Sequence, residues 1–138
     1  MQTAAYMEYT DLMTGKRAIV FALVIAIILK VFLVDLIIAQ GQSMEPAIKN
    51  GDVLIVSRLR YGIRLPWRQK YLIRWALPKA GETVVFYTPT GELAVKRCSS
   101  LFDERRFYAE GDNSLASYDS RSYGSVPVDN IIGKVLGR

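Results

Sequence analysis

Residues 83–98 read TVVFYTPTGELAVKRC, and this stretch decides the fold. Two apolar runs flank a Pro-Thr-Gly segment of turn residues, and their β-branched and aromatic side chains are typical of strands. Similar short runs bounded by turn residues occur at residues 52–58, 107–109 and 131–136. Because short runs of this kind indicate paired strands, we predict a mainly β protein in which residues 39–138 form one compact antiparallel sheet domain.

The composition excludes several kinds of chemistry. The chain has 138 residues, a formal charge of +5, no histidine and one cysteine, Cys98. Without histidine, Ser-His-Asp and Cys-His catalysis and His-ligated zinc are excluded. One cysteine forms no disulfide within the chain and no thiolate metal cage, so we interpret Cys98 as a small buried hydrophobe. If the chain is an enzyme without a cofactor, its proton acceptor is expected to be a lysine, a carboxylate or a tyrosine.

An apolar stretch precedes the β pattern. Residues 18–39 read AIVFALVIAIILKVFLVDLIIA, with only Lys30 and Asp35 charged. About 22 residues suffice to cross roughly 30 Å of hydrocarbon as a helix. A buried core helix is disfavoured because the run has no polar stripe. A cleaved signal peptide is disfavoured by the length of the run and by Lys30, although residues 39–41 offer a small-x-small site. We predict an uncleaved transmembrane helix over residues 18–38.

The charges beside this stretch predict its orientation. Lys16 and Arg17 precede it directly, whereas Lys49 is the first cation after it. The positive-inside rule then places residues 1–17 in the cytoplasm and residues 39–138 outside it. We therefore predict a single-pass protein of the cell membrane, inner or plasma, whose β domain is extracytoplasmic.

Residues 58–79 combine basic and aromatic side chains without any acidic residue. Three interpretations fit: a solvated loop, a surface for anionic lipid headgroups, or a nucleic-acid surface. Because the predicted anchor is near and Trp and Tyr prefer the membrane interface, we favour lipid headgroups as the partner and expect no nucleic acid. The side chains concerned are Arg58, Arg60, Arg64, Arg68, Lys70, Arg74 and Lys79, interleaved with Tyr61, Trp67, Tyr71 and Trp75.

Three segments carry residues suited to chemistry. Ser43 lies in Gln-Ser-Met-Glu-Pro, where a tight turn would present its hydroxyl, although a serine there is also an ordinary turn residue. Lys96 shares one face of its predicted strand with Ala94 and Cys98. Desolvation there would lower its pKa below the usual value of about 10.4 and supply a neutral amine as general base. The alternative for Lys96 is an exposed strand lysine.

The third segment, residues 111–124, reads GDNSLASYDSRSYG and is rich in turn formers and hydroxyls. Asp119 and Arg121 would pair if they fall on one side of an extended turn; otherwise the segment is a polar surface loop. With no histidine in the chain, a serine nucleophile and a lysine base form the obvious remaining dyad.

Taken together, these segments resemble bacterial type I signal peptidases, also called leader peptidases. Residues 43–46, Ser-Met-Glu-Pro, are similar to the Ser-Met-x-Pro nucleophile motif of that family, and residues 95–97, Val-Lys-Arg, to its general-base strand. Residues 111–124 resemble its Gly-Asp-Asn…Ser-x-Asp-Ser-Arg…Gly box, and residues 61–66 a segment of many Gram-negative members. The resemblance runs from about residue 18 to the C-terminus, with all boxes in order.

The resemblance implies a serine endopeptidase with a Ser-Lys dyad, in a mostly β catalytic domain at the outer leaflet. Such enzymes remove signal peptides from secreted preproteins after small-x-small sequences and use no metal or cofactor. Ser43 would be the nucleophile and Lys96 the general base. Ser117 would hydrogen-bond and orient Lys96, and Asp119 and Arg121 would form a supporting ion pair.

Two departures from the family pattern affect these expectations. Many Gram-negative members have an oxyanion-binding serine where this chain has Gly41, so the oxyanion is expected to rely on backbone N–H groups, above all that of Ser43. Residues 97–110 are short where family members usually have at least a hairpin, which puts the shape of the substrate cleft and the range of substrates in doubt. Two alternatives stay open: a self-cleaving repressor-type Ser-Lys protease, and a non-enzymatic membrane-anchored binding protein.

Overall fold

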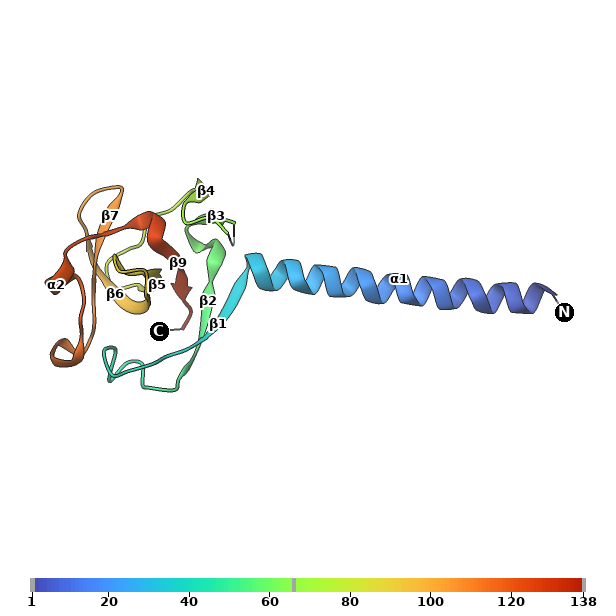
Figure 1. Cartoon of the computed structure of the whole chain (residues 1–138), viewed down its shortest axis with the longest axis horizontal. Helices are drawn as coiled ribbons and strands as arrows, with labels where there is room; N and C mark the ends of the chain where they lie inside the picture. The colour runs from blue at the N-terminus through green and yellow to red at the C-terminus, as the bar shows by residue number, and fades with distance from the viewer. Residues whose placement is uncertain (1, 66, 138) are drawn as a thin grey trace.

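The computed structural model describes the backbone of residues 2–65 and 67–137 and the side chains of residues 15–30, 33–65 and 67–137. One long helix, α1 (Gln2–Phe32), leads into a β domain at its C-terminal end (Figure 1). Lys30 lies in the last turn of α1, where a cation complements the helix dipole. The Leu33 N–H donates to the Leu29 carbonyl at 2.9 Å, and the first strand starts at the next residue.

Strand β1 (Val34–Ile38) corrects the C-terminal boundary of the predicted anchor. All five of its residues pair antiparallel with β2 (Val53–Ser57). Asp35 also approaches the Arg58 guanidinium at 3.7 Å. Residues 34–38, predicted as the end of a transmembrane helix, are therefore an edge strand, whose backbone groups are satisfied by pairing with β2.

No helix within the described part of the chain is both long and apolar enough to cross a membrane. The transmembrane helix predicted for residues 18–38 is thus not confirmed.

The β domain is built on one antiparallel seven-stranded sheet in the order β1-β2-β9-β5-β6-β7-β8, with a two-stranded sheet, β3-β4, beside it (Figure 1). This arrangement confirms the predicted mainly β, antiparallel fold. The remaining strands of the large sheet are β5 (Thr83–Tyr87), β6 (Leu93–Leu101), β7 (Arg106–Glu110), β8 (Val126–Pro127) and β9 (Ile131–Val135), and the small sheet consists of β3 (Gly62–Arg64) and β4 (Tyr71–Arg74).

The hairpin that decides the fold pairs β5 with β6, and Val84 lies opposite Lys96. The short runs predicted near residues 52–58, 107–109 and 131–136 correspond to β2, β7 and β9. Residues 97–110, which looked too short for a hairpin after the lysine strand, continue β6 to Leu101 and return as β7. The chain therefore keeps a hairpin at this place, with a turn of only residues 102–105.

Two apolar clusters hold the sheet together. One contains Phe86 and Phe107, whose rings meet edge to face with centroids 5.5 Å apart, and it includes the fully buried Cys98. Cys98 is thus the small buried hydrophobe that the sequence predicted. The other cluster contains Met44 and Ile48 from the loop after β1. The second cluster therefore ties the loop that carries Ser43 to the sheet.

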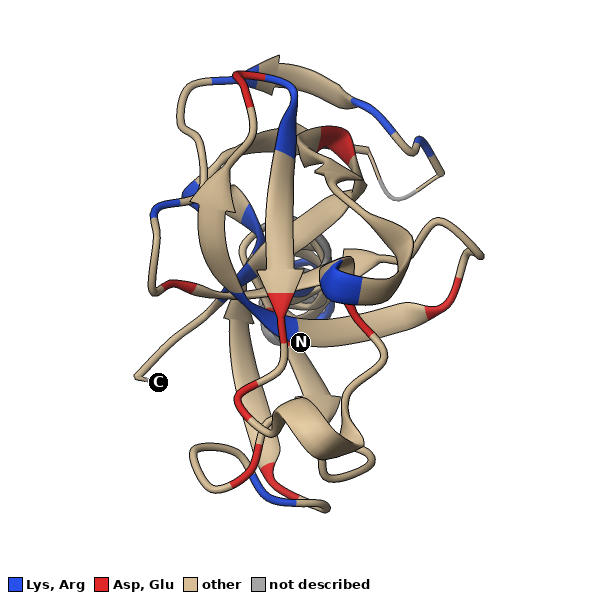
Figure 2. Cartoon of the chain, turned by 90° about the vertical axis from the view of Figure 1, so that its left-hand side faces the viewer, with Lys and Arg blue, Asp and Glu red and all other residues tan. Residues whose placement is uncertain are grey.

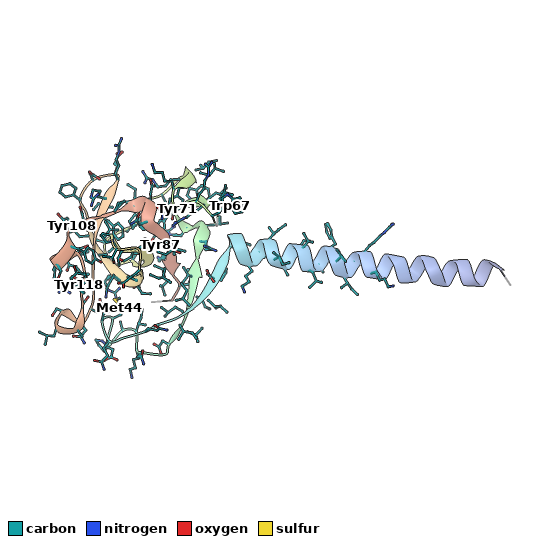
Figure 3. All side chains as sticks on the ribbon, viewed as in Figure 1. Met44, Trp67, Tyr71, Tyr87, Tyr108 and Tyr118 are labelled. Atoms are coloured by element: carbon teal, nitrogen blue, oxygen red, sulfur yellow. The ribbon has the colours of Figure 1, made fainter. Side chains whose placement is uncertain are left out.

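The basic and aromatic residues of the segment 58–79 divide between core and surface. Tyr61 is fully buried and its hydroxyl donates to Glu82 at 2.8 Å, while the hydroxyl of half-buried Tyr71 donates to the Ile131 carbonyl at 2.9 Å. Trp67 and Trp75 are 77% and 54% exposed. Trp67 lies on the side of the β domain from which α1 leaves (Figure 3). The opposite side of the domain mixes acidic and basic residues (Figure 2).

Candidate active site

The loop that carries Ser43, residues 39–52, joins β1 to β2 and is closed at its neck by backbone hydrogen bonds. The Ala39 N–H donates to the Asp52 carbonyl and the Gly51 N–H to the Ala39 carbonyl, each at 2.8 Å. These two bonds continue the β1-β2 ladder past its last residue pair. Ser43 is therefore presented on a closed loop attached to the edge of the sheet.

Ser43 itself is held from two directions within this loop. The next residue, Met44, and Ile48 are both buried, and the Ile48 N–H donates to the Met44 carbonyl at 2.9 Å. The Ser43 carbonyl accepts a hydrogen bond from the Asn113 N–H at 3.0 Å. The described residues provide no acceptor for the Ser43 N–H. Ser43 is half-buried.

Lys96 lies in the middle of β6 and is only 6% exposed. Burial lowers the pKa of its ammonium group, Asp119 opposes this change through its negative charge, and Arg121 adds to it through its positive charge. The desolvation expected from strand alternation is therefore present at this lysine. A lysine with a lowered pKa holds more of the neutral amine at a given pH than an exposed one.

Ser43 and Lys96 line the same cleft, which has a volume of about 320 Å³. Its walls come from the end of β1, from the Ser43 loop and from the first half of β6. Polar and apolar atoms share the surface of the cleft about equally. The apolar residues that line it are Ile37, Ile38, Ala39, Met44, Ile48, Leu93, Ala94 and Val95. Two residues 53 positions apart in the chain thus line one small cleft.

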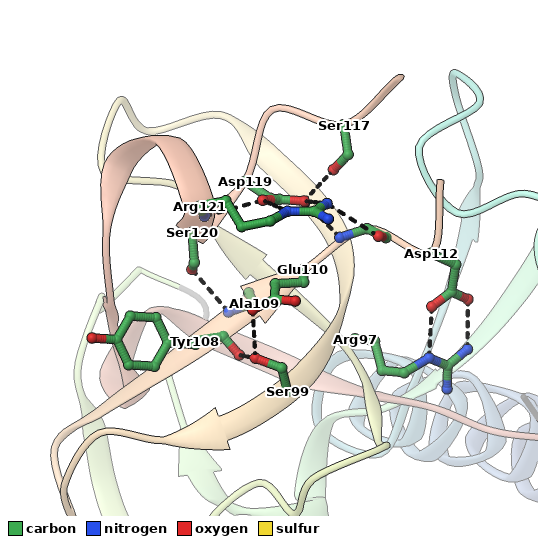
Figure 4. A network of polar contacts seen from close by, with 11 residues as sticks. Arg97, Ser99, Tyr108, Ala109, Glu110, Asp112, Ser117, Asp119, Ser120 and Arg121 are labelled. Atoms are coloured by element: carbon green, nitrogen blue, oxygen red, sulfur yellow. Dashed lines mark hydrogen bonds and ion pairs between the residues drawn. The ribbon is translucent and has the colours of Figure 1, made fainter. Parts of the chain in front are cut away.

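Asp119 is the centre of a polar network beside the Lys96 strand (Figure 4). Its fully buried carboxylate accepts hydrogen bonds from the Gly111 N–H at 2.7 Å, from the Ser117 hydroxyl at 2.5 Å and from the Arg121 guanidinium Nε at 2.9 Å. Burial alone would raise the pKa of this carboxyl, but the hydrogen bonds from Arg121, Gly111 and Ser117 outweigh burial and hold the pKa well below its usual range. Asp119 is therefore a permanent anion at neutral pH.

The network agrees with the predicted Asp119–Arg121 pair, which closes through Nη2 as well as Nε. The two residues are only two positions apart. Asp119 also caps the short helix α2 (Ser120–Tyr123) by accepting a hydrogen bond from the Arg121 N–H at 3.1 Å. Ser117, expected to hydrogen-bond Lys96, donates its hydroxyl hydrogen to Asp119. That bond leaves the lone pairs of the Ser117 oxygen as acceptors.

One ion pair beside the cleft was missed by the sequence reasoning. Arg97 binds Asp112 with two parallel hydrogen bonds, Nε to Oδ1 at 2.8 Å and Nη2 to Oδ2 at 2.7 Å. It joins the residue after Lys96 to the loop that carries Ser117. Two features of the sequence could have indicated this pair. Strand alternation turns Arg97 to the face opposite Lys96, and the acidic residue Asp112 directly follows Gly111. A metal site is not evident, since the described residues hold no cluster of three metal-ligating side chains.

Comparison with known proteins assigns the chain to a family. The sequence model of the family described as "Signal peptidase, peptidase S26" matches residues 12–105. The chain is 30% identical to Signal peptidase I of Pseudomonas aeruginosa over 116 residues, which are 75% of this chain and 41% of that protein. It is 31% identical to the mitochondrial inner membrane protease subunit 1 of Xenopus tropicalis over 116 residues, which are 75% of this chain and 68% of that protein. The chain belongs to the peptidase S26 family of signal peptidases.

The relatives differ in how much of their length this chain covers. It spans 41% of the Pseudomonas aeruginosa protein, but 80% of Signal peptidase I of Bacillus caldolyticus, to which it is 27% identical over 146 aligned residues. The family match covers the Ser43 loop, the basic segment and β6, and it ends at residue 105. The Asp119 network lies beyond that match and rests on the geometry described above.

Proposed function

We propose that this chain is a membrane-anchored endopeptidase that removes signal peptides from secreted preproteins, with Ser43 as nucleophile and Lys96 as general base. One observation carries the proposal: Ser43 and Lys96 line one small cleft, and burial there lowers the pKa of the lysine. Membership of a signal peptidase family supplies the reaction class and the class of substrate.

In the proposed reaction, the neutral Lys96 amine takes the proton of the Ser43 hydroxyl while the Ser43 oxygen attacks the scissile carbonyl carbon. The C–N bond then breaks, the Lys96 ammonium gives its proton to the leaving amine, and the signal peptide stays on Ser43 as an ester. Lys96, neutral again, takes a proton from water as the water oxygen attacks the ester. The ester bond breaks, Ser43 regains its hydrogen and the peptide leaves as a carboxylic acid.

The negative oxygen of the tetrahedral intermediate is assigned to the Ser43 N–H. This donor has no acceptor among the described residues, so it is free to bind a developing oxyanion. The Gly41 N–H is already bound to the Asn50 side chain at 2.9 Å and is not a second donor in this arrangement. A missing donor of this type costs about 10²–10³ in rate in other proteases.

Ser117, Asp119 and Arg121 are assigned supporting roles. Because the Ser117 hydrogen points to Asp119, the Ser117 oxygen presents its lone pairs, and we propose that it accepts a hydrogen bond from Lys96 and orients the amine. Arg121 keeps Asp119 paired, which limits how far that negative charge raises the pKa of Lys96.

The substrate and the membrane are assigned to neighbouring surfaces. We propose that an extended preprotein segment pairs along the cleft and places small side chains against its walls. The apolar residues of α1 would anchor the chain with its N-terminus in the cytoplasm, and the exposed Trp67 and Trp75 would meet anionic headgroups. Tyr61 is excluded from that contact because it is fully buried. The anchor would raise the local concentration of a substrate held in the same bilayer.

The test is cleavage of a panel of preproteins by the full chain in lipid vesicles, compared with Ser43→Ala. The wild type should cut after small-x-small sequences, and Ser43→Ala should not cut although it folds and inserts. An acylating serine-protease inhibitor separates the non-enzymatic alternative, because a binding protein would leave Ser43 unlabelled. The self-cleaving repressor alternative has no support in the family match and would show cleavage only of the chain itself.

A further inference from the structure

The short segment that carries the nucleophile, residues 40–43, is held by hydrogen bonds to two other parts of the molecule. The Ser43 carbonyl accepts from the Asn113 backbone N–H at 3.0 Å, and the Gly41 N–H donates to the Asn50 side-chain oxygen Oδ1 at 2.9 Å. The first bond uses only backbone atoms. The second depends on one side chain, so it is the one that a substitution can remove.

Gly41 is the flexible point of this segment. Its φ of +84° lies in the left-handed region, which glycine enters freely and other residues rarely adopt. A Cβ placed at Gly41 would meet no atom within 4 Å, so packing does not hold the residue. The hydrogen bond to Asn50 therefore fixes a peptide whose backbone would otherwise have several accessible conformations.

Asn50 is well placed to provide that restraint. The next residue, Gly51, donates its N–H to the Ala39 carbonyl at the loop neck, and the Lys49 N–H donates to the Asp52 carboxylate at 3.1 Å. The backbone on both sides of Asn50 is thus fixed, and its side chain crosses from the returning arm of the loop to the outgoing arm. Asn50 is not among the residues that line the cleft, whereas Gly41 and Ser43 are.

We propose that Asn50 is a positioning residue for Ser43: by holding the Gly41 N–H, its side-chain oxygen sets the direction of the Ser43 hydroxyl and of the Ser43 N–H. This inference rests on the proposed function and deepens it. Because Asn50 is outside the cleft, its loss should slow the chemical step and leave substrate binding almost unchanged. An effect of that kind lowers kcat and leaves KM in place.

The experiment compares Asn50→Ala, Asn50→Asp and wild type in preprotein cleavage by the full chain in vesicles. Asn50→Ala removes the acceptor oxygen and should lower kcat about tenfold, with KM within about twofold. Asn50→Asp keeps an oxygen at the same place and should restore kcat to within about threefold of wild type. The matched control is Asn130→Ala, which removes another asparagine side-chain bond to backbone, Nδ2 to the Tyr87 carbonyl at 2.8 Å, and should leave kcat unchanged.

Several results would overturn the inference. They are a kcat for Asn50→Ala equal to wild type, a change in KM alone, or an Asn50→Asp variant as slow as Asn50→Ala. Should Asn50→Ala not fold, amide hydrogen exchange at Gly41 is compared between wild type and Asn50→Asp. Equal protection of the Gly41 amide in both proteins supports the inference. An unprotected Gly41 amide in the wild type overturns it. A wild type that cleaves no preprotein would instead overturn the proposed function itself.

Discussion

Gly111 lies so close to Ser43 that a Cβ on this glycine would be 2.5 Å from the Ser43 carbonyl oxygen and would also collide with the Ser117 side chain. The glycine therefore sets how closely the loop of residues 111–124 approaches the loop of residues 39–52. The hydrogen bond from the Asn113 N–H to the Ser43 carbonyl holds that approach, and the bond from the Gly111 N–H to Asp119 fixes the shape of the 111–124 loop itself. The position of Ser43 relative to the loop that carries Ser117 therefore depends on a contact that leaves no space for a methyl group.

Gly111→Ala should therefore damage activity more than stability. The added methyl group must push the two loops apart, which costs about 1–3 kcal/mol as overpacking. A displacement of about 1 Å at the reacting atoms lowers the rate about 10²-fold. Cleavage rate and thermal midpoint are measured on the same sample. The control is Ser114→Ala, an exposed position of the same loop, and a Gly111→Ala variant with full activity would show that the close approach is not required.

The pH dependence of cleavage should report Lys96. Because burial lowers its pKa, the neutral amine forms at lower pH than on an exposed lysine, and kcat should rise with pH with a midpoint below the usual lysine value of about 10.4. Arg121→Gln removes a positive charge that lowers this pKa, so the rising limb should move to higher pH. The measurement is kcat between about pH 6 and about pH 11. A rate independent of pH, or a limb that moves to lower pH in Arg121→Gln, would contradict this role of the amine.

Asp119→Asn should weaken the fold in a pH-dependent way. The hydrogen bonds that hold the pKa of Asp119 below its usual value contribute stability above the unfolded-state pKa of about 3.9, and this contribution is lost as the pH falls through the lower folded-state pKa. The variant should lose about 2 kcal/mol or more at neutral pH, since hydrogen bonds to a buried charge are removed. Denaturant unfolding at several pH values measures this. A constant difference down to strongly acidic pH would show that ionisation of Asp119 is not its source.

The chain contains only two tryptophans, which permits a direct test of the membrane contact. Trp75→Phe leaves Trp67 as the single fluorescent indole, 77% exposed in the β domain. In vesicles with anionic headgroups, we expect Trp67 emission to be quenched by lipids brominated near the headgroup and shielded from acrylamide. The matched protein, Trp67→Phe, reports Trp75 in the same way. If acrylamide quenched the tryptophan emission as strongly in vesicles as in the unfolded, detergent-free chain, membrane contact at that tryptophan would be ruled out.

How far the sequence predicts this structure can be followed in particular residues. Strand alternation around Lys96 makes it a candidate for burial but leaves an exposed strand lysine as the alternative, and the folded structure decides between them, because the residue is only 6% exposed. The boundary at residue 33 was not predictable from hydropathy, because the apolar run continues without Gly or Pro from α1 into β1. The burial of Tyr61 and Tyr71 was also out of reach, since their partners, Glu82 and the Ile131 carbonyl, are 21 and 60 residues away in the chain.

The candidate site shows the same limit. Asp119 and Arg121 are only two positions apart, so their pairing could be predicted from the sequence of one extended turn. The direction of the Ser117 hydroxyl, to Asp119, and the Asn50 bond to Gly41 depend on how a loop closes, and spacing carries no such information. Sequence alone identifies the residue types of the site, whereas the hydrogen-bond partners that orient them require the folded loops.

The central claim, that Lys96 activates Ser43, is tested most directly by trapping the acyl-enzyme. Wild type, Lys96→Ala and the exposed-lysine control Lys49→Ala are each mixed with a preprotein, quenched in acid and analysed by mass spectrometry for signal peptide attached to Ser43. We predict that wild type and Lys49→Ala form the ester at equal rates and that Lys96→Ala forms it about 10²–10⁴ times more slowly while folding normally. Ester formation in Lys96→Ala at the wild-type rate, or an ester on a residue other than Ser43, would contradict the claim.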